Sequence, residues 1–252
     1  MKPTIIIDAG HGGYDNGASY NGRKEKDDNL RLALAVGSLL EQDGFPVVYT
    51  RTTDVYQRPI DKARIANESG GDYFVSFHRN SSPNANVYSG VQTLVYDDSG
   101  ITGQLAGNIN AQLKKVGFDD LGIPIRKDLI VLRKTKMPAV LIEAGFLNND
   151  ADNEIFDENF EAMAQAIATG IEQTVNEVQT EKRFGVQVGL FRRYENAMYL
   201  FNKLIKEGYY VQIRVYNGLY AVVVGREDTL EGARVLEKTL QSEGYATLIV
   251  NL

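Results

Sequence analysis

The chain has 252 residues, of which 43% are hydrophobic and 24% charged, and its formal net charge is −6 at pH 7. These values are typical of a folded globular protein of one or two domains and exclude a disordered chain. The negative charge argues against nucleic acid as a partner, because phosphates require a basic surface. The sequence contains no cysteine, so disulfides and thiolate metal sites are excluded, and a transition metal must be held by His, Asp or Glu.

We expect no secretion signal at the N-terminus. Residues 1–13 contain one Lys and a short apolar run, whereas a signal peptide needs about 7–15 apolar residues before its cleavage site. No stretch approaches the roughly 18 apolar residues of a membrane span. We therefore expect a protein that is cytoplasmic at synthesis and not inserted in a membrane.

Strand and helix patterns alternate through the first two thirds of the chain. Short apolar runs predict strands, and apolar residues at helical spacing predict the helices between them. The first helix is predicted to begin at Asp28, a good N-cap residue, and to end at Gly44. The predicted strands are 4–8, 46–50, 72–78, 90–97 and 138–146, and the predicted helices are 28–44, 59–71, 101–117 and 159–178. This alternation predicts an α/β domain with a mainly parallel sheet and helices on both faces.

A polar run over 175–183 is interpreted as the end of the last helix followed by a short linker, with a continuous solvated helix as the alternative. Residues 184–213 and 220–249 then match each other at a constant offset of 36. Each copy has the pattern strand, helix, strand, which predicts a βαβ–βαβ (ferredoxin-like) domain of about 70 residues. The predicted organisation is a catalytic domain over 1–176, a linker over 177–183 and a small domain over 184–252.

Three predicted strands of the first domain end on residues that carry chemistry: His11, His78 and Glu143. The carboxyl ends of parallel strands meet at one edge of a sheet, where ligands of such folds bind. A single histidine at a strand end is more often structural, but these are the only two histidines of the chain. Glycines surround His11 and allow backbone and substrate to approach closely. The pattern indicates a metal site.

A catalytic zinc requires three protein ligands and one open position, and two His with one Glu is a known set. Glu25 is the best third ligand, because the loop between it and His11 is rich in Gly, Asn and Asp and can fold back. Asp8 and Asp15 are the rival candidates, and Asp8 is alternatively a residue that holds a histidine ring. The HExxH motif is absent, which excludes a helix-borne zinc site of that kind.

Glu143 is left for a different role. Zinc lowers the pKa of its bound water, and a nearby carboxylate can take that proton and pass it to a leaving amine. The alternative is a structural carboxylate that caps the next helix or pairs with an Arg.

Three segments of the sequence resemble the motifs of a known enzyme family. The segments HGGYDNGASYNGRKEK, SFHRNSS and DLIVLRKTKMPAVLIEAGFLNN occur in the order and spacing of three motifs of the zinc-dependent N-acetylmuramoyl-L-alanine amidases (the Amidase_3 family), and the chain resembles this family from residue 4 to about 175. The resemblance implies that His11, Glu25 and His78 bind one Zn²⁺ per chain and that Glu143 is the catalytic carboxylate. Two features depart from the family: Arg79 replaces a small residue, and the stretch between His78 and Glu143 is short. The first bears on substrate contacts, and the second implies a site that is open without an activator.

The C-terminal repeat resembles a SPOR domain, a peptidoglycan-binding module. The resemblance implies glycan strands as the ligand, bound on the sheet face. Outward positions on that face are predicted to be Gln187, Arg214, Tyr216 and Tyr220.

These observations predict a peptidoglycan hydrolase that cleaves the amide between the lactyl group of N-acetylmuramic acid and L-alanine, with zinc-activated water and Glu143 as general base and acid. The alternatives are another zinc-dependent cell-wall peptidase or deacetylase, and a non-catalytic cell-wall-binding protein. Without a secretion signal, the expected setting is lysis after release to the wall, either by a phage endolysin or by a host autolysin that lyses the mother cell in sporulation.

Overall fold

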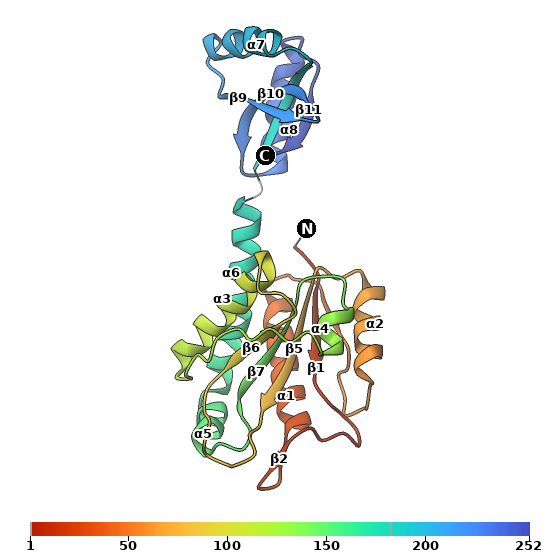
Figure 1. The fold of residues 1–252 in the computed structure, drawn as a ribbon, viewed down its shortest axis with the longest axis vertical. Coiled ribbons are helices and arrows are strands. Elements are labelled where there is room, and N and C mark those ends of the chain that lie inside the picture. The colour runs from red at the N-terminus through yellow and green to blue at the C-terminus, as the bar shows by residue number, and fades with distance from the viewer. Residues whose placement is uncertain (1, 182) are drawn as a thin grey trace. The chain divides into compact units, whose positions relative to one another are not determined.

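The computed structural model describes residues 2–181 and 183–252, and the chain divides into two compact units, 1–175 and 176–252 (Figure 1). In the described part of the chain, no helix is long and apolar enough to cross a membrane.

The first unit is built on a five-stranded sheet in the order β4-β1-β5-β7-β6. Its strands are β1 (Ile5–Ala9), β4 (Val47–Tyr49), β5 (Tyr73–Asn80), β6 (Gln92–Val95) and β7 (Ala139–Phe146). The pairs of β1 with β4, β1 with β5 and β5 with β7 are parallel, whereas β6 pairs with β7 antiparallel at one edge. The prediction of a mainly parallel sheet is therefore confirmed.

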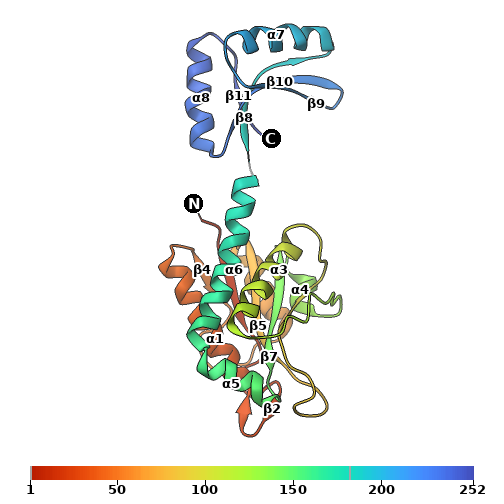
Figure 2. The ribbon, with the colours of Figure 1, turned by 90° about the vertical axis from the view of Figure 1, so that its left-hand side faces the viewer.

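Helices cover both faces of this sheet, as Figures 1 and 2 show. Successive residues of a strand point to opposite faces, so Ile5 and Ile7 pack into one core cluster and Ile6 into the other. The larger cluster takes side chains from α1, α3 and α6, and the smaller one from α2 and α4. The helices are α1 (Glu25–Gln42), α2 (Pro59–Ser69), α3 (Gly100–Val116), α4 (Ile130–Lys134), α5 (Asp150–Glu158) and α6 (Phe160–Glu181), and a hairpin of β2 (Ser19–Tyr20) and β3 (Arg23–Lys24) precedes α1.

The predicted N-cap at Asp28 is wrong, because α1 begins three residues earlier, at Glu25. The preceding loop supplies the partners that a cap would otherwise supply: the N–H groups of Glu25 and Lys26 donate to the carbonyls of Ala18 and Asn16, at 3.0 and 3.1 Å. Asp28 lies inside the first turn and pairs with Arg23 and Arg79.

At the C-terminal end of the unit, α6 continues to Glu181. Most of the predicted linker is therefore helical, and residue 182 lies outside the described residues.

The second unit contains the predicted repeat. Its elements are β8 (Phe184–Phe191), α7 (Tyr194–Lys206), β9 (Val211–Tyr216), β10 (Leu219–Glu227), α8 (Leu230–Ser242) and β11 (Leu248–Asn251). The antiparallel sheet has the order β11-β8-β10-β9 and packs on both helices. The two copies exchange equivalent contacts: the hydroxyl of Tyr209 donates to Glu243 at 2.7 Å, and that of Tyr245 donates to Glu207 at 2.8 Å.

One predicted outward position of this sheet is wrong. Tyr220 lies on the same face of β10 as Val222 and packs into the core between the sheet and the helices, where it also contacts the ring of Tyr194. Arg214 and Tyr216 lie on the opposite face from the core residue Ile213, since side chains alternate along β9.

Candidate metal centre

The sheet register brings the predicted residues together. His78 of β5 and Glu143 of β7 are directly paired neighbours, and His11 follows the end of β1, the strand on the other side of β5. The two imidazole rings meet edge to face with their centroids 4.9 Å apart.

The loop after β1 is shaped to bring the His11 ring to this point. His11 has φ 59°, a left-handed conformation that costs free energy in a non-glycine residue and is typical of functional sites. A Cβ at Gly10 would collide with the His78 ring, and a Cβ at Gly17 would collide with the Glu25 carboxylate and the His11 ring. These two glycines therefore leave the room in which the three side chains converge.

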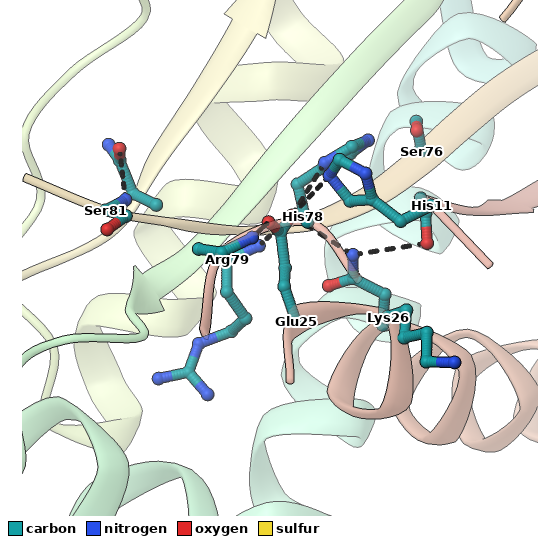
Figure 3. Close-up of polar contacts among 12 residues, drawn as sticks. His11, Glu25, Lys26, Ser76, His78, Arg79 and Ser81 are labelled. Carbon is teal, nitrogen blue, oxygen red and sulfur yellow. Dashed lines mark hydrogen bonds and ion pairs between the residues drawn. The ribbon is translucent and has the colours of Figure 1, made fainter. Parts of the chain in front are cut away.

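Glu25, the first residue of α1, completes the cluster. Its Oε1 lies 2.8 Å from Nδ1 of His78 and 3.2 Å from Nε2 of His11 (Figure 3). One ligand atom from each of the three residues lies within 4.8 Å of the others, and among the described residues only this group meets that criterion. The other carboxylate oxygen of Glu25 accepts the backbone N–H of Ala18 at 2.9 Å, which fixes the orientation of the group.

The three residues are electrostatically coupled. Burial disfavours the charged Glu25 carboxylate, but hydrogen bonds and charge from both histidines hold the pKa of Glu25 far below its usual range. Burial likewise disfavours a charged His11, but Glu25 and Asp15 outweigh it and raise the pKa of His11 to about 9. A carboxylate held ionised between two imidazoles is the donor set of a divalent transition metal.

The two rival ligands occupy other roles. Asp15 accepts a hydrogen bond from Nδ1 of His11 at 2.9 Å and so leaves Nε2 of the ring directed at Glu25. Asp8 is fully buried and bonds to none of the cluster: it accepts from Thr50 and Ser76 at 2.6 Å each and from Lys62 at 2.8 Å. The alternative assignment of Asp8 to a histidine ring is therefore wrong, and Asp15 is the residue that makes this contact.

Glu143 differs from all of these carboxylates. The residue is half-buried, its Oε2 is shielded from solvent, and this oxygen has no hydrogen-bond partner among the described residues. Burial raises the pKa of Glu143 to about 7, even though the nearby histidines act to lower it. The two structural roles considered for Glu143 are filled by other residues. Asn149 caps α5, the helix that follows β7, and Arg126 pairs with Asp128.

Arg79 points away from the cluster (Figure 3). Its side chain is buried on the opposite face of β5, where it pairs with Asp28 at 2.6 Å, donates to Asn153 at 2.8 Å and lies over the ring of Phe156. The Arg in place of a small residue therefore does not line the site; it fastens β5 to α1 and α5.

A cleft of about 300 Å³ opens beside the two histidines. The segment 129–131 and Leu141 form an apolar wall, and Gln57 and Lys62 line the cleft as well. Sequence reasoning did not identify this wall, although its residues lie in the DLIVLRKTKMPAVLIEAGFLNN segment that carries part of the resemblance.

Comparisons with known proteins identify the family of each unit. The family model described as N-acetylmuramoyl-L-alanine amidase matches residues 5–173, and the SPOR domain model matches residues 180–251. The chain is 35% identical over 201 residues to the sporulation-specific N-acetylmuramoyl-L-alanine amidase of Bacillus subtilis, with 77% of each chain covered. It is 38% identical over 183 residues to the endolysin of Bacillus phage SPP1, which covers 70% of this chain and 67% of the endolysin.

Solved structures give the same result. An N-acetylmuramoyl-L-alanine amidase from Clostridium difficile superposes with a TM-score of 0.66 at 33% identity, over 69% of this chain and 97% of the other. The catalytic domain of an amidase from Bacillus (Paenibacillus) polymyxa gives a TM-score of 0.64 at 35% identity, over 70% of this chain and 99% of the other.

Proposed function

Because the chain belongs to the N-acetylmuramoyl-L-alanine amidase family and carries a C-terminal SPOR domain, we propose that it is a zinc hydrolase of peptidoglycan. It cleaves the amide between the lactyl group of N-acetylmuramic acid and L-alanine. His11, Glu25 and His78 hold one zinc ion, and Glu143 is the catalytic general base and acid.

The donor set supports zinc as the metal. Two imidazoles and one carboxylate are a known set for catalytic zinc, which keeps a position open for water or substrate. Asp15 adds the carboxylate that fixes a ligating histidine ring, as neighbouring carboxylates do in many zinc sites. When bound, zinc polarises a carbonyl group and makes nearby water more acidic.

The observation that carries the catalytic assignment is the Glu143 carboxyl group, paired in the sheet with His78, whose shielded Oε2 has no partner among the described residues. A general base works best with a pKa near the working pH, and burial places the pKa of Glu143 at about 7. Glu143 therefore accepts a proton from the attacking water and returns it to the nitrogen of L-alanine as the amide breaks.

We also propose a division of roles between a catalytic domain, residues 1–176, and a wall-binding domain, residues 184–252. The SPOR domain holds the enzyme on its insoluble substrate and raises the effective concentration of cleavable bonds. The similarity to a sporulation amidase and to a phage endolysin supports a role in cell lysis.

A metal-exchange experiment with product analysis tests this proposal. The purified chain is treated with a chelator, assayed on peptidoglycan, and assayed again after addition of Zn²⁺. We expect activity to be lost and then restored, and mass spectrometry to detect stem peptides with a free N-terminal L-alanine. Release of acetate would indicate a deacetylase, and cleavage within the stem peptide would indicate a peptidase. Wall binding without release of peptide would indicate a binding protein, and each of these results would overturn the proposal.

A further inference from the structure

Two exposed tyrosines belong to loops that also supply residues of the candidate site. Tyr14 precedes Asp15, which bonds to His11, and is 79% exposed; Tyr56 precedes Gln57, which lines the cleft, and is 37% exposed. Their ring centroids are 4.2 Å apart. Val55, also exposed, extends the apolar surface. Contiguous exposed apolar surface of this kind commonly marks a binding site.

The backbone that carries Tyr14 is held by hydrogen bonds, although its side chain is exposed. Tyr14 sits at the tip of a tight turn over residues 12–15, closed by two backbone hydrogen bonds between Gly12 and Asp15. The tip is anchored from below, because Gly13 donates to Asp54 at 2.7 Å and accepts from Lys26 at 2.7 Å. Lys26 and Asp54 also pair with each other at 2.6 Å.

The segment that carries Tyr56 packs directly on this turn. A Cβ at Gly12 would collide with the carbonyl of Val55, and a Cβ at Gly13 would come within 2.8 Å of the backbone of Tyr56. A ligand that binds the two rings therefore loses little free energy to ordering of the backbone, since the two loops already pack on each other.

We propose that Tyr14 and Tyr56 form a carbohydrate-binding platform at the mouth of the metal centre, which packs against a sugar ring of the glycan strand during cleavage. This inference rests on the proposed function. The lactyl amide hangs from a sugar ring, so the strand must pass close to the metal ligands, and Tyr14 belongs to the same loop as His11. A pyranose ring presents a face of C–H groups that packs well on an aromatic face. The apolar-walled cleft beside the histidines is left for the peptide.

Inhibition kinetics test the platform on the full zinc-loaded chain. Hydrolysis of a soluble muramoyl tripeptide is measured with one of two added inhibitors, a peptide-free oligosaccharide of the glycan strand or the free stem peptide. In the double variant Tyr14→Ala/Tyr56→Ala, we expect the inhibition constant of the oligosaccharide to rise by about tenfold, the loss of one to two ring contacts. We expect the inhibition constant of the free peptide to stay unchanged in this variant. Tyr14→Phe keeps the ring and keeps wild-type inhibition, and Tyr199→Ala, which removes an equally exposed tyrosine from α7 (79% exposed), has no effect.

Unchanged inhibition by the oligosaccharide in the double variant would overturn the platform. So would a weaker inhibition by the free peptide alone, because the occupant would then be peptide. A second measurement does not depend on turnover: NMR signals of the Tyr14 and Tyr56 rings shift on addition of the oligosaccharide, while that of Tyr199 stays fixed. Failure of the proposed function would show as wild-type protein without turnover, whereas failure of the platform would show as ring signals that do not move.

Discussion

The two units of the chain differ in what they bury. The first unit encloses charged side chains in its interior, among them Asp8, Glu25, Lys62 and Arg79. In the described part of the second unit, every buried residue is apolar or glycine. A buried charge is costly unless it is paired, so a fold retains one where the charge has a structural or chemical use. The second unit presents its polar groups outward instead, as a domain that only binds its ligand can do.

Within the first unit, two carboxylates of the sheet, the buried Asp8 and the half-buried Glu143, make the distinction sharper. Asp8 has three hydrogen-bond donors, and these and the charge of Lys62 outweigh its burial and lower its pKa. Glu143 has an oxygen without a partner, and burial raises its pKa. The satisfied carboxylate holds β1, β4, β5 and α2 together. The unsatisfied one is available to exchange a proton.

The largest effect is expected from Glu143→Gln, which keeps the shape of the side chain and removes its proton chemistry. Turnover on peptidoglycan is expected to fall by about 10²–10⁴-fold. The thermal midpoint of the zinc-loaded protein should not fall, because a buried unpaired acid is replaced by a neutral amide. Assays at about pH 7 with zinc analysis of both proteins check this, and wild-type turnover in the variant would contradict the division between the two carboxylates.

The next effect is on stability. Arg79→Met removes a buried charge that Asp28 and Asn153 satisfy, and the expected loss in the free energy of unfolding is about 3 kcal/mol. The matched control is Arg64→Met, which breaks the exposed ion pair with Glu68 and should cost less than about 1 kcal/mol. Urea unfolding of both variants measures the difference. Equal stabilities would mean that buried charge in the first unit is not structural.

The independence of the units is tested by Leu240→Ala in α8. Leu240 is fully buried in the second core, and its truncation is expected to destabilise that unit by about 2–5 kcal/mol. Sedimentation with cell wall should weaken, while hydrolysis of a soluble muramoyl tripeptide stays at the wild-type rate. Val235→Ala, at an exposed position of the same helix, is the control. A parallel fall in soluble turnover would show that the first unit depends on the second.

Local patterns in the sequence predicted much of this fold. The apolar runs of β1, β5 and β7 are evident by themselves, and the only two histidines both follow such runs, so the edge where the candidate metal site lies could be predicted. The glycines around His11 also predicted a close approach of the chain at this point. In the structure, Gly10 and Gly17 leave room for the candidate ligands.

Two predictions were wrong: the start of the first helix and the outward position of Tyr220. The first depends on non-local contacts, and the second overlooked the alternation of side chains along a strand. The first helix starts at Glu25 because carbonyls of a folded-back loop bind its N–H groups, and the sequence near Asp28 does not reveal that loop. The prediction of a mainly parallel sheet did not say which strand departs from it, because the antiparallel pairing of β6 depends on its contact with β7. Tyr220, in contrast, could have been placed correctly, because the period of two in β10 puts it on the same face as Val222.

The smallest effect is expected at Glu172 of α6. It resembles Glu143 in its pKa and in having a shielded oxygen without a partner among the described residues, but its neighbour is Asp43 and not the candidate metal ligands. Burial and the neighbouring Asp43 carboxylate raise the pKa of Glu172 to about 7. The folded chain therefore binds this proton more tightly than the unfolded chain, whose value is near 4.5. Folding stability is thus highest at low pH with respect to this group and declines as pH rises from about 4.5 to about 7.

Glu172→Gln removes this decline. The variant should match the wild type near pH 4.5 and have a slightly higher thermal midpoint above about pH 7, while hydrolysis is unchanged at both. Thermal unfolding and turnover measured across this pH range check the expectation, with Glu68→Gln as an exposed control. A loss of turnover in Glu172→Gln would mean that a raised pKa marks catalytic function even away from the metal ligands. If Glu172→Gln changes stability but not turnover, a raised pKa is not sufficient for catalysis. The position of Glu143 beside His11, Glu25 and His78 then distinguishes it from Glu172.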